Sequence, residues 1–250
     1  MEETFLLKIE NVSCESEKGD SLKNISFSVK KGESIAIFGP EDSGIEIICP
    51  LVAGLISEYT GNVYYKGLSV KSFDYLETHK YRKELGYLQR DYGLISNMSV
   101  HENISLPLKY HSKLSSKEIE VIVNWMIENF GMLHCKDKRP VGLSRSEKLR
   151  TAFLRAIVLD PELILLEHSL EGQCLFSSRI FLASIKQDLI SRTISAIFTG
   201  YDPRLYMDLA SEYIMLHKGN IVFNGTREEF ESMDNPYLRQ YFNSLTDSPV

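Results

Sequence analysis

The sequence predicts an α/β fold built around a mainly parallel sheet. Two short apolar segments, residues 163–166 and 194–198, are separated by a helix-length stretch, which is the alternation expected of strand–helix–strand units. A third apolar run at residues 34–38 stops at Gly39-Pro40, as a buried parallel strand does where it enters a loop. Apolar side chains at helical spacing across residues 115–132 predict that the middle third of the chain is helical.

The remaining elements follow from the same patterns. Residues 6–12 and 25–29 alternate apolar and polar side chains, which predicts strands with one wet face. Residues 45–56 predict a helix, and residues 62–67 a further strand and turn. Near the C-terminus, two strands predict a hairpin around Lys218-Gly219-Asn220, followed by an amphipathic tail at 235–242. No internal repeat or low-complexity linker interrupts residues 1–250, so we expect a single domain.

Composition restricts the classes of function. The chain has 250 residues, 43% of them hydrophobic, enough for one sizeable core or for a core with a smaller subdomain. A formal net charge of −6 without long runs of one sign argues against nucleic acid as a partner. No apolar stretch approaches the ~18 residues that a membrane span needs. Four scattered cysteines and residues 1–4, which lack signal-peptide features, lead us to expect a reducing cytoplasm.

The loop that follows residues 34–38 has the spacing of a phosphate cradle. It consists of Gly39, Pro40, Glu41, Asp42, Ser43 and Gly44. The loop leads into a predicted helix, whose first backbone N–H groups would point toward the centre of the loop. A chain with 15 glycines contains about one such glycine pair by chance. On this loop alone, an ordinary strand-to-helix turn is therefore an equal alternative.

Segments along most of the chain give the loop its context. They include Leu22-Lys-Asn-Ile-Ser-Phe-Ser-Val before the loop, Ala53-Gly-Leu55, Asn97-Met-Ser-Val-His-Glu-Asn-Ile104, Pro140-Val-Gly-Leu-Ser144 and His217-Lys-Gly219. In order and spacing, residues 6 to about 225 resemble an ATP-binding subunit of an ABC transporter. The tail Asn235-Pro-Tyr-Leu-Arg-Gln-Tyr-Phe242 is similar to the ATPases of Mla-type phospholipid transporters, which implies a role in lipid transport.

The resemblance implies a P-loop NTPase-like ABC ATPase fold. That fold has a mainly parallel sheet core, an antiparallel β subdomain and a helical subdomain that carries the signature motif. On this chain the implied core with its antiparallel part covers residues 1–90 and 151–250, and the helical subdomain covers residues 91–150.

At the nucleotide-handling positions, this chain departs from the family pattern. Ile45 and Glu46 stand where the family has a lysine that reaches the terminal phosphates and a hydroxyl that binds magnesium. A carboxylate there opposes polyphosphate by roughly 1 to 4 kcal/mol per charge pair at ~4 Å. Glu167 replaces the Walker B aspartate, and His168 replaces the catalytic glutamate beside it. Pro50 also falls inside the predicted helix, where it can cost ~3 kcal/mol or distort the helix.

Three further motifs depart in the same way. The Q-loop glutamine position falls on Arg90, with Gln89 one residue earlier, and Tyr201 stands where the family has its switch histidine. The signature L-S-G-G-Q reads Leu143-Ser144-Arg145-Ser146-Glu147, so bulk and charge replace the glycines that approach phosphate. No catalytic residue, ATP, magnesium or other metal is expected on this interpretation.

The segment after the Q-loop keeps the family pattern. In the family it lines the groove that receives the permease, and here the matching residues are Asp91, Met98, Val100, Glu102, Asn103 and Ile104. We therefore expect a non-catalytic ATPase-like subunit, structural or regulatory, held at the inner face of the cell membrane by a multi-span permease. A second ABC ATPase subunit, identical or related, is a further expected partner.

Two alternatives stay open at this stage. One is a weak ATPase with unusual ligands, in which Glu46 and Glu167 hold a metal, His168 acts as base, and Arg90 and Arg145 bind phosphate. This alternative requires ATP and magnesium. The other is a regulator without a permease, which has kept the fold and binds another protein or a different anion.

Overall fold

The structure is a computed structural model that describes residues 5–15, 19 and 21–246, with side chains to residue 243. Residues 1–4, used above for the signal-peptide argument, lie outside this part. The chain forms two compact units: residues 1–78 with 195–250 make unit 1, and residues 79–194 make unit 2. The predicted helical subdomain at 91–150 falls within unit 2, and its own bounds stay a prediction.

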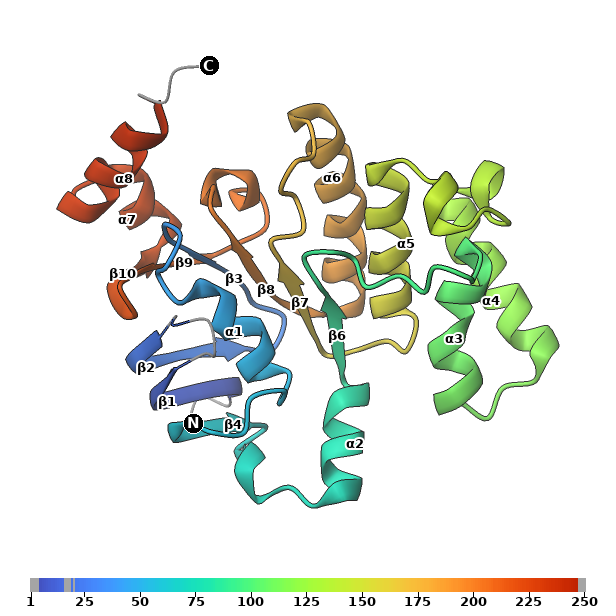
Figure 1. Cartoon of the computed structure of the whole chain (residues 1–250), viewed down its shortest axis with the longest axis horizontal. Helices are drawn as coiled ribbons and strands as arrows, with labels where there is room; N and C mark the ends of the chain where they lie inside the picture. Colours follow the sequence, from blue (N-terminus) through green and yellow to red (C-terminus); the bar gives the residue numbers. More distant parts are fainter. Residues whose placement is uncertain (1–4, 16–18, 20, 247–250) are drawn as a thin grey trace. The chain divides into compact units, whose positions relative to one another are not determined.

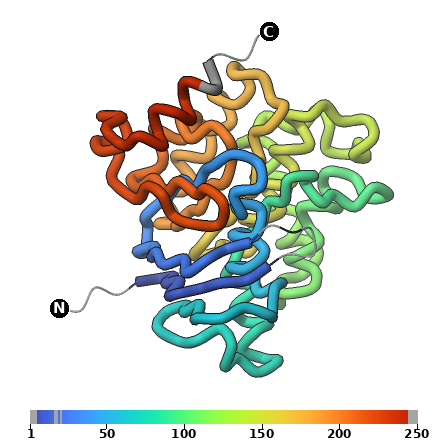
Figure 2. The backbone as a smooth tube through the Cα atoms, turned by 60° about the vertical axis from the view of Figure 1, so that its left-hand side comes forward, coloured from blue at the N-terminus to red at the C-terminus, as the bar shows by residue number. Residues whose placement is uncertain are grey.

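Unit 1 contains an antiparallel sheet in the strand order β2-β1-β4-β5. Its strands are β1 (Phe5–Glu15), β2 (Ser21–Lys30), β4 (Thr60–Tyr65) and β5 (Leu68–Ser69). Figure 2 shows the two long N-terminal strands, in dark blue, running side by side. Leu7 and Ile9 on β1 and Val29 on β2 are buried beside less buried neighbours, as predicted, but Leu6 is buried too and a register shift between Ile9 and Val12 interrupts the alternation.

A second set of strands in unit 1 is mainly parallel. β3 (Ser34–Phe38) pairs in parallel with both β8 (Ser195–Gly200) and β9 (Glu212–His217), and β10 (Asn220–Thr226) pairs antiparallel to β9. Every residue of β3 and β8 is buried, which explains why both read as continuous apolar runs. The predicted α/β fold with a mainly parallel core and an antiparallel part is confirmed.

Helix α1 (Ile45–Val52) is shorter than the predicted 45–56. Gly54 adopts φ 66° just beyond the helix end, and the N–H groups of Leu55 and Gly54 bond to the carbonyl oxygens of Pro50 (2.9 Å) and Leu51 (3.1 Å). This Schellman arrangement closes the helix four residues earlier than predicted, at the Ala53-Gly-Leu55 segment. Pro50 lies inside the helix without breaking it.

The C-terminal part of unit 1 is held by aromatic packing. It contains the short helices η4 (Pro203–Tyr206), α7 (Arg227–Ser232) and α8 (Pro236–Thr246). Phe230 of α7 stacks on Tyr213 of β9, with ring centroids 4.4 Å apart and planes 6° apart. The same ring meets Phe38 and Phe242 edge-on, each with centroids 5.7 Å apart. The predicted amphipathic tail is thus a helix that covers an aromatic cluster.

Unit 2 pairs two parallel strands with several helices (Figure 1). The strands are β6 (Leu85–Leu88) and β7 (Leu163–Glu167), and the helices are α3 (Val100–His111), α4 (Ser116–Asn129), α5 (Arg145–Ile157) and α6 (Leu175–Arg192). α2 (Tyr75–Lys83) contains the boundary between the units. Three single turns complete the description: η1 (Val70–Ser72) in unit 1, and η2 (Leu133–Cys135) and η3 (Pro140–Gly142) in unit 2. The predicted helical region is confirmed, with α4 ending three residues before 132.

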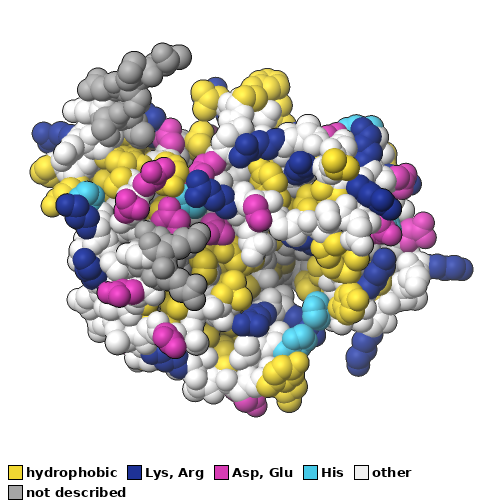
Figure 3. All heavy atoms as spheres, viewed as in Figure 1, with side chains coloured by type: hydrophobic (Ala, Val, Ile, Leu, Met, Phe, Trp, Pro, Cys, Tyr) yellow, Lys and Arg dark blue, Asp and Glu magenta, His cyan; other side chains and the backbone are white. Residues whose placement is uncertain are grey.

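Each of α3, α4 and α5 begins with a capping box. The N-cap residues are Ser99, Ser115 and Ser144. In each helix the serine hydroxyl accepts from the N–H of a glutamate three residues later, and that glutamate's carboxylate accepts from the serine N–H. No helix in the described part of the chain is long and apolar enough to cross a membrane. On the face seen in Figure 3, basic and acidic side chains are interspersed. That mixture agrees with the argument against nucleic acid.

Candidate functional site

The loop at residues 39–44, predicted from its spacing to be a phosphate cradle, is a tightly packed strand-to-helix turn. It connects β3 to α1, and both of its glycines are required by close approach of other backbone. A Cβ on Gly39 would lie 2.3 Å from the Leu216 carbonyl oxygen, and a Cβ on Gly44, at φ 89°, would lie 2.4 Å from the Ser21 carbonyl oxygen. Only glycine fits these two positions, so the shape of the loop is fixed by unit 1 itself.

The side chains at the start of α1 lie against other parts of unit 1. Ile45 is fully buried, and so is Ser43 within the loop. Glu46 lies in the first turn of α1, where the helix dipole favours a negative charge, and its Oε1 accepts a hydrogen bond from the Tyr201 hydroxyl at 3.3 Å. Its Oε2 is buried without a hydrogen-bond partner among the described residues. The chain's own carboxylate therefore occupies the end of the helix that would attract an anion.

Helix α8 reaches the same loop. The Tyr241 hydroxyl lies 3.2 Å from the Gly39 carbonyl oxygen and 2.6 Å from that of Tyr201, and it donates to these acceptors. One phenol thereby connects the C-terminal helix to the loop and to the residue that holds Glu46. Tyr241 could not be predicted as part of this site, because 202 positions separate it from Gly39.

In unit 2, the residues at the end of β7 contact other side chains of the same unit. Glu167 accepts a hydrogen bond from the Tyr87 hydroxyl at 2.6 Å. His168 has φ 45° and a side chain with no exposed surface, and its Nδ1 pairs with the Glu171 carboxylate. The other Glu171 oxygen lies 2.8 Å from Arg90 Nη2. Two predicted site residues, Arg90 and His168, are thus brought together through Glu171, which the sequence analysis missed.

Arg145 packs against the loop after β7. A Cβ on Gly172 would lie 2.6 Å from the guanidinium carbon of Arg145, so only glycine leaves room for this contact. Arg145 Nε donates to the Tyr92 hydroxyl at 3.3 Å, and Gln173 Nε2 donates to the same oxygen at 3.0 Å. The guanidinium is therefore held by contacts within unit 2.

The first turn of α5 carries Ser144, Arg145, Ser146 and Glu147. The Ser144 hydroxyl accepts from the Glu147 N–H at 3.3 Å, and Glu147 Oε2 accepts from the Ser144 N–H at 2.7 Å. Partial burial acts to raise the pKa of Glu147, but the hydrogen bonds from Ser144 and the nearby His134 outweigh it and lower that pKa to about 2. An ionised carboxylate is thus fixed at this helix N-terminus.

We expect Glu147→Gln to make the free energy of unfolding less dependent on pH in the acidic range. The native pKa of Glu147 lies below its ordinary 4.5, so its contribution is full above pH 4.5 and is lost as the pH falls toward about 2. Solvent screening reduces this contribution, so the loss amounts to roughly 1 kcal/mol by pH 3. Urea unfolding between pH 6 and pH 3 measures it. Glu118→Gln, at an exposed capping box, is the matched control and should reduce the pH dependence of the free energy of unfolding less. Equal pH dependence in both variants would contradict a special role for Glu147.

The residues predicted to face a permease differ in exposure. Val100, Asn103 and Ile104 are fully buried, whereas Asp91 and Glu102 are exposed and Met98 is partly exposed. Asn103 holds the preceding loop, because its Oδ1 accepts from the Ile95 N–H at 2.9 Å and its amide donates to the Met98 carbonyl oxygen at 3.2 Å. These three buried residues can therefore only support such a surface, while the other three can contribute side chains to it.

Comparisons with known proteins agree with this architecture. The ABC transporter family profile matches residues 22–169. The intermembrane phospholipid transport system ATP-binding protein MlaF of Haemophilus influenzae is 26% identical over 247 residues, which cover 98% of this chain and 93% of that protein. MlaF of Escherichia coli K12 is 25% identical, covering 91% and 84%. The molybdate/tungstate import ATP-binding protein WtpC of Pyrococcus abyssi is 32% identical over 72% of this chain and 51% of its own.

Solved structures show the same fold. The dimeric structure of MJ0796, a bacterial ABC transporter cassette, superposes with a TM-score of 0.80 at 21% identity and covers 88% of this chain and 98% of its own. The structure of cbiO1 from Clostridium perfringens gives a TM-score of 0.79 at 20% identity, with 97% and 100% covered. At these identities the likeness concerns the fold alone.

Proposed function

Because the chain belongs to the ABC transporter family, we propose that it is a non-catalytic ATP-binding-cassette subunit with a structural or regulatory role beneath a membrane permease. The observation that carries this proposal is the start of α1. Glu46 there holds its carboxylate against Tyr201, and Ile45 is buried instead of offering a cation. The chain has the fold of the family, while the side chains at the family's nucleotide-binding positions make contacts within the protein.

ATP with magnesium does not fit the residues of this loop. Ile45 removes the cation that would neutralise the terminal phosphates, and Glu46 adds a negative charge close to where they would lie. The Oε2 atom of Glu46 is already buried without a hydrogen-bond partner among the described residues, so a nearby anion would be placed against an unsatisfied negative oxygen. We derive no catalytic step through the nucleotide.

Unit 2 supports the same proposal. A general base needs a ring nitrogen within reach of a water, and the His168 side chain has no exposed surface. Arg90, which would have to contact phosphate in a weak ATPase, is ion-paired with the same Glu171. Arg145 is held on Tyr92. Each residue that an alternative ATPase mechanism would use thus has a structural partner.

We further propose that the permease partner belongs to a phospholipid transport system and holds the subunit at the inner face of the membrane. Support comes from the MlaF relatives, whose similarity extends over more than nine tenths of this chain. The exposed Asp91 and Glu102 and the partly exposed Met98 are the side chains we assign to the permease contact. A second ABC subunit, identical or related, would complete the assembly.

Thermal unfolding with and without millimolar Mg-ATP tests the loss of nucleotide binding. A ligand at ~100 times its Kd adds ~2.7 kcal/mol, which raises the Tm of a chain of this size by about 5 to 10 °C. We expect no rise for this protein, since neither the charge nor the ligands of the loop favour ATP. An ABC ATPase with an intact P-loop, treated identically, is the positive control. A clear rise, with magnesium-dependent turnover that His168→Ala abolishes, would replace the proposal by the weak ATPase.

Affinity purification from detergent-solubilised membranes tests the permease contact separately. A multi-span permease should be recovered with the wild-type chain and recovered less with Asp91→Arg, because that side chain is exposed. Recovery of only a water-soluble partner would favour the regulator that acts without a permease. A permease unrelated to the Mla type would end the phospholipid proposal.

A further inference from the structure

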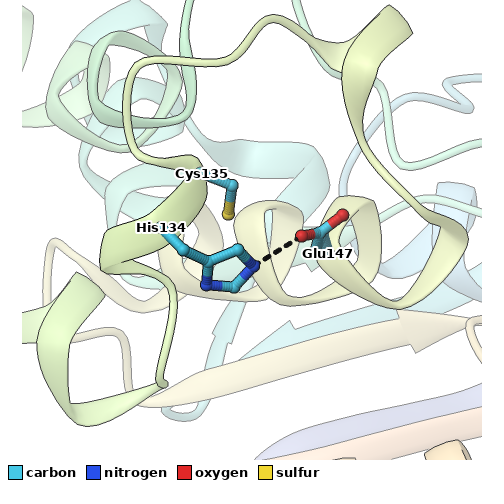
Figure 4. A group of neighbouring side chains, drawn as sticks. All are labelled: His134, Cys135 and Glu147. Carbon is cyan, nitrogen blue, oxygen red and sulfur yellow. Dashed lines mark hydrogen bonds and ion pairs between the residues drawn. The ribbon is translucent and has the colours of Figure 1, made fainter.

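Three potential metal ligands converge in unit 2, as Figure 4 shows. His134 and Cys135 belong to η2, and Glu147 lies in the first turn of α5. One ligand atom from each residue lies within 4.8 Å of the other two. His134 Nε2 lies 2.8 Å from Glu147 Oε1, and the Cys135 side chain lies beside this pair. This group could not be predicted from the sequence, because Cys135 has no C-x-x-C spacing and Glu147 lies twelve positions beyond it.

We propose that His134 Nε2, Cys135 Sγ and Glu147 Oε1 form a binding site for Zn²⁺, with water in the fourth position. Imidazole, thiolate and carboxylate are the ligand types that zinc takes, and three protein ligands with one open position is a familiar zinc geometry. Calcium and magnesium prefer oxygen ligands throughout, so a site with sulfur and nitrogen selects against them. The site is separate from the P-loop and does not depend on the proposed function.

The ligand atoms, which lie within 4.8 Å of one another, must rearrange by about 1 Å to admit the ion. Bonds of about 2.0 to 2.3 Å in a tetrahedron place the ligand atoms roughly 3.3 to 3.7 Å apart. The His134–Glu147 pair at 2.8 Å must therefore open by less than about 1 Å. The His134 side chain is 61% exposed, so its ring can move and the ion can enter from solvent. The buried Cys135 forms the floor of the site.

The surroundings already orient the ligands. Glu147 uses Oε2 for the Ser144 N–H at 2.7 Å, which leaves Oε1 directed at His134 and fixes the carboxylate plane. The Cys135 thiol donates to the Met132 carbonyl oxygen at 3.3 Å. On binding, the S–H bond breaks, the sulfur forms a bond to zinc, and the proton leaves to solvent.

Charge balance also suits a divalent cation. A thiolate from Cys135 and the carboxylate of Glu147 together neutralise Zn²⁺, so the bound ion leaves no net charge at the site.

The ion would fasten η2 to the first turn of α5. That turn carries the signature-position residues, where the family resemblance expects glutamine in place of Glu147. An amide oxygen is a poor zinc ligand, whereas a carboxylate is a good one. The change that removes a nucleotide-facing group therefore supplies the third ligand of the site.

The test uses the full chain, stripped with a chelator and titrated with Zn²⁺ and with Co²⁺ as a spectroscopic probe. We expect one equivalent to bind, a rise in Tm, and for Co²⁺ the thiolate charge-transfer absorption with the visible bands of tetrahedral geometry. His134→Ala and Glu147→Gln should each weaken zinc binding by about 100-fold or more, since even residues behind a ligand change affinity 10- to 100-fold. Cys135→Ser should abolish the charge-transfer absorption.

Controls separate this site from adventitious thiol binding. Cys174→Ser removes the exposed cysteine and should change neither the affinity nor the spectrum. His134→Ala alters an exposed side chain, so it keeps the test valid if Cys135→Ser fails to fold. Absence of zinc binding, retention of full affinity in His134→Ala and Glu147→Gln, or loss of the signal in Cys174→Ser would each overturn the proposal.

Discussion

Replacement of Phe230 by alanine is expected to destabilise the protein by about 3 to 5 kcal/mol. Phe230 is 1% exposed, and it contacts Tyr213 of β9, Phe38 of β3 and Phe242 of α8. Truncation removes the ring's buried area and leaves a cavity whose walls come from two strands and a helix, which cannot close around it together. Two edge-to-face pairs and one stacked pair are lost at the same time.

Denaturant unfolding monitored by circular dichroism measures this effect. Phe176→Ala is the matched control, because the same deletion there removes a ring that is 74% exposed and should change stability by no more than about 0.5 kcal/mol. Equal midpoints for Phe230→Ala and wild type would mean that α7 and α8 contribute little to unit 1. A large effect would place the C-terminal helices within the folded core of that unit.

The double substitution Ile45→Lys/Glu46→Ser is expected to give the chain a measurable affinity for Mg-ATP. It restores a cation and a hydroxyl at the start of α1 while Gly39 and Gly44 keep the shape of the loop. Removal of the carboxylate alone ends a repulsion of roughly 1 to 4 kcal/mol, which corresponds to about 5- to 1000-fold in affinity. Hydrolysis should stay absent, since His168 still occupies the catalytic position.

Binding of a fluorescent ATP analogue to wild type and variant measures the gain. Glu41→Gln, which removes an exposed carboxylate of the same loop, is the control and should leave binding weak. Glu46→Gln isolates the charge, because it keeps the size of the side chain beside Tyr201. If the double variant still fails to bind while its unfolding midpoint is unchanged, other features of the loop exclude nucleotide and the electrostatic account is wrong.

Much of the fold could be predicted from the sequence because its signals are local. The buried strands β3 and β8 read as continuous apolar runs, and the antiparallel β1 and β2 read as alternation. The predicted helix at 45–56 was too long, because helical periodicity outweighed the Ala53-Gly-Leu55 stop signal, which Gly54 supplies through its positive φ. A pattern of side chains shows where a helix or strand lies, but it defines the last residue of that element poorly.

The sequence by itself determined which residues stand at the positions that the family resemblance assigns to nucleotide, namely Ile45, Glu46 and His168. The tertiary structure decided which contacts their side chains make. Glu46 meets Tyr201 across 155 positions and Gly39 meets Tyr241 across 202, separations at which no sequence spacing predicts contact. The convergence of His134, Cys135 and Glu147 has the same origin, because η2 and α5 are brought together by packing and not by periodicity. Local patterns specify elements, whereas the pairing of distant side chains depends on how those elements pack.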